Sequence, residues 1–325
     1  MIYTSINKLL HIKYPLIQGG MAWVADAELA SAVSNAGGLG VIAAGYAPEE
    51  WIRNEIRKAR NLTKKPFALN IMLLNPEADK ISRVAVEEGV EVIITGAGSP
   101  GKYISLWKNN GIKILPVIPS VSIARRMEKM GVDALIAEGG EAGGHIGELT
   151  TMTLIPQVVD AVNIPVIAAG GIGDGRGLAA ALMLGASGVQ IGTRFLVAHE
   201  CTISSAYKEK ILQAKDTSTI VTGRATGHPV RVIKNQLARD FQRLEKIKET
   251  SLEEYEKLGQ GSLYRATREG DMENGSIMAG QISGLIQREQ SCREIIEEIF
   301  SEAKNLIIQK SALLQDQYQN DTVKE

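Results

Sequence analysis

Residues 165–194 read PVIAAGGIGDGRGLAAALMLGASGVQIGTR, and this stretch decides the fold. An apolar run ends at Gly170 and Gly171, a segment rich in Ala, Leu and Met follows, and a second apolar run ends at Gly192. This order predicts a buried parallel strand, a helix and a second parallel strand. Glycines at strand ends leave backbone N–H groups uncovered, and a following helix N-terminus adds a positive dipole, so we expect an anion site. The alternative is that these glycines serve only as turn and cap residues.

Six further short apolar runs precede this stretch and alternate with helix-like segments. They cover residues 14–21, 38–44, 66–73, 90–95, 112–118 and 134–138. Such alternation is typical of a parallel sheet covered by helices, and eight strands close a (β/α)8 TIM barrel. A doubly wound open sheet shares the alternation, but its phosphate-binding glycine turn normally follows the first strand. Here the best anion site follows the seventh and eighth strands, as in many TIM barrels, so the pattern favours the barrel.

The chain has 325 residues, which exceeds the length of a plain barrel. Residues 198–274 are polar and charged, with helical stretches predicted at 204–214, 230–248 and 252–258 and a strand-like stretch at 219–223. This composition predicts a substrate-binding or cap region inserted after the last strand. We therefore expect a barrel at 1–197, this region at 198–274, a returning segment with a helix over 292–314 at 275–314, and a flexible tail at 315–325.

Composition narrows the class of partner. The net charge is −1 and like charges form no long blocks, which argues against a nucleic-acid partner and against electrostatic binding to membranes. Cys201 and Cys292 stand apart from any CxxC pair or histidine cluster, so neither a metal site nor a disulfide framework is predicted. The N-terminus has only short apolar runs, and no later run approaches membrane-spanning length. We expect a cytoplasmic chain without membrane insertion.

Candidate functional residues were collected from the ends of the predicted strands, because barrel sites form there. They are Gly20, Met21, Asn70, Gly96 to Ser99, Pro119, Ser120, Glu138 to His145, Gly170, Gly171, Gly192 and Thr193. Asn70 and Glu138 are polar residues at strand ends, where an unpaired buried group is costly. We interpret both as hydrogen-bonding anchors for a polar ring system, although rim residues satisfied by the protein are the alternative.

His145 is the candidate for chemistry. It lies in the glycine-rich segment EGGEAGGHIG (138–147), which is expected to be a flexible loop directly after a strand. An imidazole there suits acid–base work or a hydrogen bond to a substrate carbonyl, whereas the alternative is an ordinary surface histidine. His11 and His199 lie outside the predicted site, and His228 occupies a tight turn from which a contact with substrate stays open.

Other catalytic groups are missing from the strand ends. No GxSxG context, no strand-end lysine and no carboxylate–histidine cluster is present, so covalent and metal catalysis find no support. A bound cofactor that carries a phosphate would supply the reactive group.

Four stretches together resemble the nitronate monooxygenase (2-nitropropane dioxygenase-like) family of FMN barrels. They read GGMA (19–22), EGGEAGGHIG (138–147), AAGGI (168–172) and QIGTRF (190–195). Two later stretches are similar to the FMN-dependent enoyl-acyl-carrier-protein (enoyl-ACP) reductase II branch of this family, TGRATGHPVR (222–231) and GSIMAGQ (275–281). The resemblance runs from about Ile6 to beyond Gln281.

This resemblance implies specific roles. The FMN phosphate would lie at Gly170, Gly171, Gly192 and Thr193, the ring near Gly20, Met21, Asn70 and Glu138, and Gly143, Gly144 and Met278 beside it. His145 would be the catalytic residue, which polarises a thioester carbonyl or helps protonation. Apolar residues near Met278 and Ile282 would suit an acyl chain.

The implied activity is reduction of trans-2-enoyl thioesters in fatty acid biosynthesis, with NADH or NADPH as reductant by way of FMN. The resemblance also implies an acyl carrier protein partner, a homodimer and stimulation by a monovalent cation. A nitronate monooxygenase, with His145 as general base, is the close alternative, and a flavin-free phosphate-binding barrel such as a sugar-phosphate isomerase is a more distant one. The chain has no GxGxxG fingerprint, so the choice between NADH and NADPH stays open.

Overall fold

In the computed structural model, the described residues are 2–247 and 250–321, with side chains described as far as residue 312. Eight parallel strands form a barrel in the order β1-β9-β8-β6-β5-β4-β3-β2. They are β1 (Leu16–Gln18), β2 (Gly40–Ala43), β3 (Phe67–Met72), β4 (Val92–Gly96), β5 (Lys113–Ile118), β6 (Leu135–Glu138), β8 (Val166–Ala169) and β9 (Gly188–Ile191). A bridge between Ile17 and Leu39 joins β1 to β2 and closes the ring. The predicted TIM barrel is confirmed, with one strand in each predicted run.

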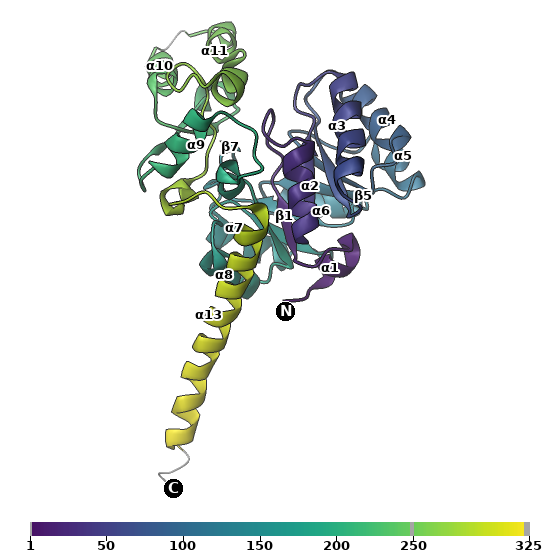
Figure 1. The fold of residues 1–325 in the computed structure, drawn as a ribbon, viewed down its shortest axis with the longest axis vertical. Helices are drawn as coiled ribbons and strands as arrows, with labels where there is room; N and C mark the ends of the chain where they lie inside the picture. Colours follow the sequence, from purple (N-terminus) through teal and green to yellow (C-terminus); the bar gives the residue numbers. More distant parts are fainter. Residues whose placement is uncertain (1, 248–249, 322–325) are drawn as a thin grey trace.

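Alternate strand residues separate two apolar clusters. Ile136 and Ile167 belong to the cluster inside the barrel, whereas their neighbours Leu135 and Ala168 belong to the cluster between the strands and the outer helices. This follows from the period of two along a strand. Helix α1 (Ser5–Leu10) adds Ile6 and Leu10 to the inner cluster and so covers one end of the barrel. Figure 1 shows α1 below the barrel, at the opposite end from the segment 198–274 in green.

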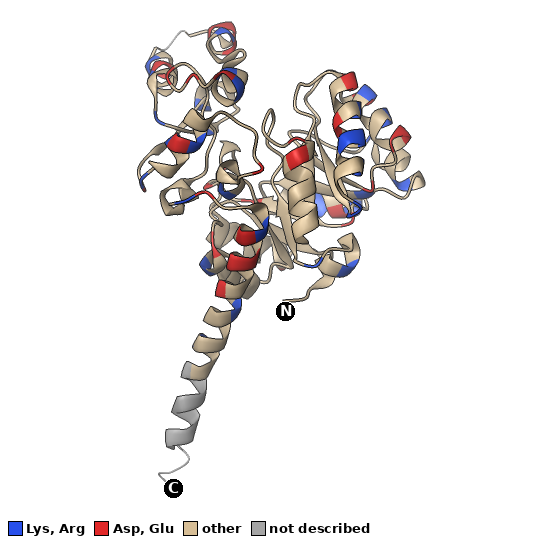
Figure 2. Ribbon diagram, viewed as in Figure 1, with Lys and Arg blue, Asp and Glu red and all other residues tan. Residues whose placement is uncertain are grey.

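The outer layer consists of one helix after almost every strand. These helices are α2 (Ala27–Ala36), α3 (Glu49–Leu62), α4 (Ala78–Glu87), α5 (Ile104–Asn109), α6 (Val121–Lys129), α7 (Thr151–Val159) and α8 (Gly175–Met183). Each buries an apolar face, as α3 does with Ile52, Ile56 and Ala59 at helical spacing. Figure 2 shows acidic and basic residues interspersed over these helices and over the segment 198–274, as the sequence predicts.

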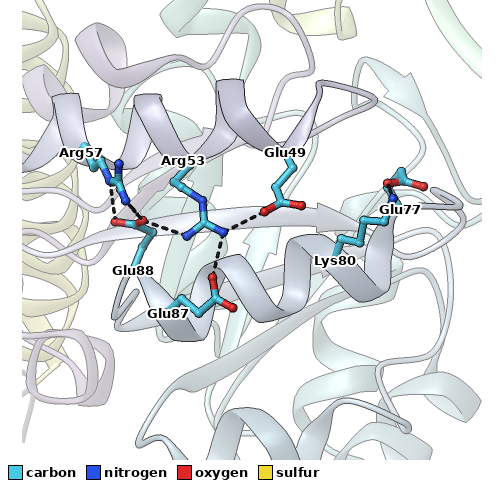
Figure 3. Close-up of polar contacts among 7 residues, drawn as sticks. All are labelled: Glu49, Arg53, Arg57, Glu77, Lys80, Glu87 and Glu88. Atoms are coloured by element: carbon cyan, nitrogen blue, oxygen red, sulfur yellow. Dashed lines mark hydrogen bonds and ion pairs between the residues drawn. The ribbon is translucent and has the colours of Figure 1, made fainter.

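The solvent faces of α3 and α4 are joined by ion pairs. Arg53 contacts Glu49, Glu87 and Glu88, at 2.8, 2.8 and 3.1 Å, and Arg57 also pairs with Glu88 (Figure 3). Exposed pairs of this kind contribute little to stability, so the apolar faces hold these helices on the barrel.

After β9 the chain forms η1 (Thr193–Val197) and then the segment 198–274, here called the cap region. It contains α9 (Ser205–Leu212), β10 (Thr219–Thr222), η2 (Arg224–Thr226), β11 (Val230–Ile233), α10 (Gln236–Glu245), α11 (Leu252–Gly259), α12 (Ser262–Tyr264) and the π-helical turn η3 (Arg265–Glu269). The helix predicted over 230–248 is wrong at its start, because β11 pairs with β10 and with β7 (Gly144–His145) in an antiparallel sheet.

The last segment returns to the barrel through η4 (Gln281–Leu285) and α13 (Cys292–Asp321). Helix α13 runs along α8 and continues beyond the body of the molecule (Figure 1), past its predicted end at residue 314. Residues 322–325 of the predicted tail lie outside the described residues, so its flexibility stays a prediction. Among the described helices, none combines the length and the apolar character that crossing a membrane requires.

Candidate active site

The loop after β1 lies between β3 and β9 at the C-terminal end of the barrel. A Cβ atom on Gly20 would stand 2.4 Å from Cγ of Asn70, and one on Gly19 would stand 3.2 Å from Cα of Gly192. Met21 completes this contact, because a Cβ on Gly192 would meet its sulfur at 3.6 Å. Glycine is therefore required at Gly20, and the predicted residues of β1, β3 and β9 form one wall.

The opposite wall consists of the loops after β6 and β8 and the segment 275–281. Gly170 has a φ of +85°, and a Cβ on it would stand 2.7 Å from the carbonyl oxygen of Gly139. A Cβ on Gly143 would stand 2.6 Å from the carbonyl carbon of Ala279. The N–H of Gly280 donates to Oγ1 of Thr193 at 2.9 Å. These contacts connect the second wall to the start of η1 and close a ring of loops.

The expected anion site changes in one respect. The first N–H groups of α8 are already occupied, because Asp174 accepts from Arg176 and Gly177, and Glu302 of α13 accepts from Gly175 at 2.7 Å. These N–H groups are therefore occupied by the protein's own carboxylates. The expectation that this helix N-terminus binds a separate anion such as phosphate is wrong. Two groups of backbone donors remain. One is at Gly170–Gly171, with φ of +85° and +68°, and the other is at the start of η1, which no side chain caps.

Three polar side chains occupy inward-facing positions at the top of the barrel. They are Asn70, Glu138 and Gln190. The strand residues next to each of them belong to the outer cluster, and successive side chains point to opposite faces, so these three point toward the barrel axis. Within the described part of the chain, the Glu138 carboxyl has no hydrogen-bond partner and Oε1 of Gln190 is buried without one. Burial raises the pKa of Glu138 to about 7. Buried polar atoms without a partner are rare, so Oε1 of Gln190 points to a polar ligand at this position.

His145 does not lie in a free loop. Gly144 and His145 form β7, in which His145 stands opposite Val230, and the N–H of Ile146 donates to the carbonyl of Pro229 at 3.1 Å. The His145 side chain stays exposed, yet surrounding protein atoms and the nearby His228 lower its pKa. The prediction of a flexible loop is therefore wrong, because pairing with the cap region orders this segment.

Residues of the cap region also contact Met278 and the Gly139–Gly140 turn. Met278 forms a bridge with Val232, and its carbonyl accepts from the hydroxyl of Tyr207 at 2.8 Å. A Cβ on Gly144, whose φ is +78°, would meet the sulfur of Met278 at 3.6 Å. Arg231 donates from Nη2 and Nε to the carbonyl of Gly140 at 2.8 and 3.0 Å.

The predicted site residues thus meet at one end of the barrel. Those brought together are Gly20, Met21, Asn70, Glu138, Gly143, Gly144, His145, Gly170, Gly171, Gly192, Thr193 and Met278. Of the remaining candidates, Gly98 packs on Leu73 and Pro119 packs on Gly147, behind this ring. Their roles in binding stay predictions.

Sequence reasoning missed Gln190 and Arg231. A glutamine inside the apolar run of β9 was the available signal for the first. Arg231 had no signal, because its partner is a backbone carbonyl far away in the chain.

Close-packed glycine loops beside inward-facing polar side chains, at the C-terminal ends of the strands, are typical of the functional site of a TIM-barrel enzyme. The model of the family described as "Nitronate monooxygenase" matches residues 4–302. The chain belongs to this family, and it is a flavin-dependent oxidoreductase.

Similar proteins cover nearly the whole chain. The structure of FabK from Thermotoga maritima is 46% identical, with a TM-score of 0.93 over 96% of this chain and 100% of that one. The (3aS,4S,5R,7aS)-5-hydroxy-7a-methyl-1-oxo-octahydro-1H-indene-4-carboxyl-CoA dehydrogenase of Mycobacterium tuberculosis is 35% identical over 96% of this chain and 99% of its own length. A probable nitronate monooxygenase of Staphylococcus saprophyticus is 35% identical over 94% of this chain and 98% of its own length.

Proposed function

We propose that this chain is an FMN-dependent enoyl-ACP reductase, which reduces trans-2-enoyl thioesters with NADH or NADPH. The observation that carries the proposal is the likeness to FabK, an enoyl-ACP reductase II, at 46% identity over 96% of the chain, cap region included. The Mycobacterium tuberculosis relative is named for a carboxyl-CoA substrate, which is also a thioester. An acyl carrier protein partner, a homodimer, a monovalent cation and a cytoplasmic location belong to the same proposal.

The residues of the site fit FMN. Gly170, Gly171 and Gly192 carry no side chain, and their backbone N–H groups, with that of Thr193, would bind the phosphate. Glu138 is well placed to share a proton with a polar ring edge, since its pKa is about 7. When bound, FMN supplies the hydride carrier between the nicotinamide and the enoyl thioester.

His145 provides a hydrogen bond to the thioester carbonyl in this proposal. Its lowered pKa keeps the imidazole neutral near pH 7, and a neutral imidazole has one N–H donor. Negative charge develops on the carbonyl oxygen during reduction, so a donor placed there lowers the barrier. Pairing of β7 with β11 holds the donor in place.

The acyl chain needs an apolar surface beside His145. Met278 is half-buried and lies next to Gly144, so it is available for this contact. Ile282 is 7% exposed and packs on Gly173, where a Cβ would stand 3.2 Å away. Ile282 stays a prediction, and Met278 is the apolar contact that we propose.

The test compares two reactions of the flavin-loaded protein. NADH or NADPH consumption with crotonyl thioester under anaerobic conditions supports the reductase. Oxygen uptake with an alkyl nitronate, together with no turnover of the thioester, would overturn it.

His145→Ala is expected to lower thioester reduction about 100-fold, the range of one acid–base or polarising group. His199→Ala is the matched control, because His199 is exposed and lies outside the site. Full activity of His145→Ala with FMN bound would contradict the assigned role.

Nitronate monooxygenase is the second candidate. The family model and the name of the Staphylococcus relative favour it. The lowered pKa of His145 suits it as well, since a neutral imidazole can accept a proton from a nitroalkane. A protein that stays colourless after incubation with FMN would instead support a flavin-free phosphate-binding barrel.

A further inference from the structure

Two of the four histidines of the chain meet at the site. Val230 stands opposite His145 in the β7–β11 pair, and the carbonyl of Pro229 accepts from Ile146, so His228 follows directly along the same edge. The two imidazoles are close enough for His228 to lower the pKa of His145. Both side chains are exposed and so share access to solvent and to a substrate over the site.

The turn that carries His228, residues 223–229, is well ordered by hydrogen bonds. Gly223 and Gly227 adopt φ of +77° and +76°, which lets the chain reverse. Oγ1 of Thr226 donates to the carbonyl of Gly223 at 2.7 Å and accepts from the N–H of His228 at 3.2 Å. The imidazole itself makes no hydrogen bond to another described residue. Hydrogen bonds therefore fix the backbone of His228, and its imidazole is available to contact a substrate.

Charged groups around this turn are already engaged. Arg224 donates from Nη1 to Glu148 at 2.8 Å, and its backbone N–H donates to Glu245 of α10 at 2.9 Å. Arg231 of β11 is bound to the carbonyl of Gly140. Glu141 accepts from Thr151 at 2.9 and 3.0 Å. His145 is thus the titratable group beside His228; burial first, and His228 second, lower its pKa.

We propose that His228 is a second catalytic residue, which donates a proton to the α-carbon of the enoyl thioester while His145 binds the carbonyl. This inference rests on the proposed reductase function. The reaction adds a hydride, derived from NADH or NADPH, at the β-carbon and breaks the carbon–carbon double bond. The electron pair released toward the α-carbon takes the N–H proton of the His228 imidazolium, and the neutral imidazole regains a proton from solvent.

The division of roles follows from the surroundings of the two rings. His145 is held in β7 and its protonated form is disfavoured, so it suits a neutral hydrogen-bond donor. His228 lies on a solvent-exposed turn, from which it can be recharged after each turnover.

The first experiment measures crotonyl-thioester reduction by the flavin-loaded protein. His228→Gln and His228→Ala are expected to lower kcat about 100-fold with KM within about threefold, the loss typical of one general acid. Added imidazole is expected to restore His228→Ala by at least about tenfold, because the site is open to solvent. His199→Ala serves as control, and the flavin absorbance spectrum and the melting temperature report that the variants are folded and loaded.

A second measurement does not depend on turnover. Four histidines give few imidazole signals in NMR, so His145 can be titrated in the flavin-loaded protein. In His228→Gln its titration midpoint is expected to rise, since the neighbouring charge is removed. An unchanged midpoint would overturn the pairing of the two histidines.

The outcomes separate the two proposals. A wild-type protein that does not reduce enoyl thioesters sinks the proposed function and this role together, while the NMR titration still decides whether the histidines interact. An active wild type with His228→Gln within twofold of it, or without imidazole rescue of His228→Ala, sinks the role of His228 alone.

Discussion

The barrel and the cap region differ in how much of their residues they bury. In the barrel, whole strands such as β8 are buried on both faces, and their neighbours are parallel strands of the same kind. In the cap region, three of the four residues of β10 are only partly buried, and α10 buries only Leu237 and Ala238. The barrel is therefore held by continuous apolar packing, whereas the cap region depends on a limited core and on specific contacts.

Several of those specific contacts join the two regions. Arg231 binds the carbonyl of Gly140, Thr202 donates to Asp26 at 2.6 Å, and Arg268 lies 3.7 Å from the same carboxylate. The cap region is thus attached to the barrel loops through polar contacts, whereas the barrel itself is held by apolar packing.

The largest expected effect lies inside the barrel. A Cβ on Gly40 would stand 1.7 Å from the carbonyl oxygen of Ala30 in α2, so Gly40→Ala must displace that helix. We expect a loss of at least about 3 kcal/mol in the free energy of unfolding, measured by denaturant titration. Gly96→Ala is the matched control, because nothing lies within 4 Å of its Cβ position. Equal stability of the two variants would contradict tight packing of β2 on α2.

Glu138 makes the stability of the barrel depend on pH. Burial raises its pKa from 4.5 to about 7, so the folded chain without flavin retains a proton that the unfolded chain releases. The stabilisation is complete below pH 4.5 and is lost as the pH rises through 7. Glu138→Gln, which cannot ionise, should match the wild type at pH 4 and exceed it by up to about 3 kcal/mol at pH 8. Thermal unfolding at both pH values tests this, and a constant difference would contradict it.

Gly170→Ala is expected to weaken cofactor binding by displacing the loop after β6. The added Cβ would meet the carbonyl of Gly139 at 2.7 Å, and a φ of +85° is unfavourable for alanine. We expect FMN affinity to fall by at least about tenfold, which corresponds to about 1.4 kcal/mol. Gly111→Ala has a similar φ of +73° with nothing within 4 Å, so it separates backbone strain from the loss of the site. Flavin fluorescence titration of both variants measures their FMN affinities.

The smallest expected effect tests the contact between the regions. Arg231→Lys loses one of the two donors to the carbonyl of Gly140, so FMN affinity should fall by a few-fold, about 1 kcal/mol, with barrel stability unchanged. Arg239→Lys is the control, since the exposed Arg239 side chain hydrogen-bonds to Gln236 of its own helix. A change in unfolding free energy without a change in affinity would mean that this arginine supports the fold and does not adjust the site.

Strands were predictable where burial is continuous. The runs around β3, β5 and β8 are apolar, and turn residues bound them, so local composition locates each one. The opposite holds for β11, where Val230, Ile233 and Leu237 recur at helical spacing, yet the first of them pair with β10. Pairing with a distant strand overrode the local pattern there. A strand of two residues such as β7 carries no pattern at all.

The amino-acid sequence by itself determined the barrel and the positions of the glycines in the cofactor site, because buried strands and glycine turns leave local signals. Tertiary structure alone decided three features: Glu302 lies on the N-terminus of α8, Arg231 binds the carbonyl of Gly140, and His228 reaches His145. Each depends on contacts between segments far apart in the chain, and such contacts leave no spacing in the sequence. The stretch 165–194 therefore locates the cofactor site that we propose, while the approach of the cap region to β7 brings together the residues of the proposed chemistry.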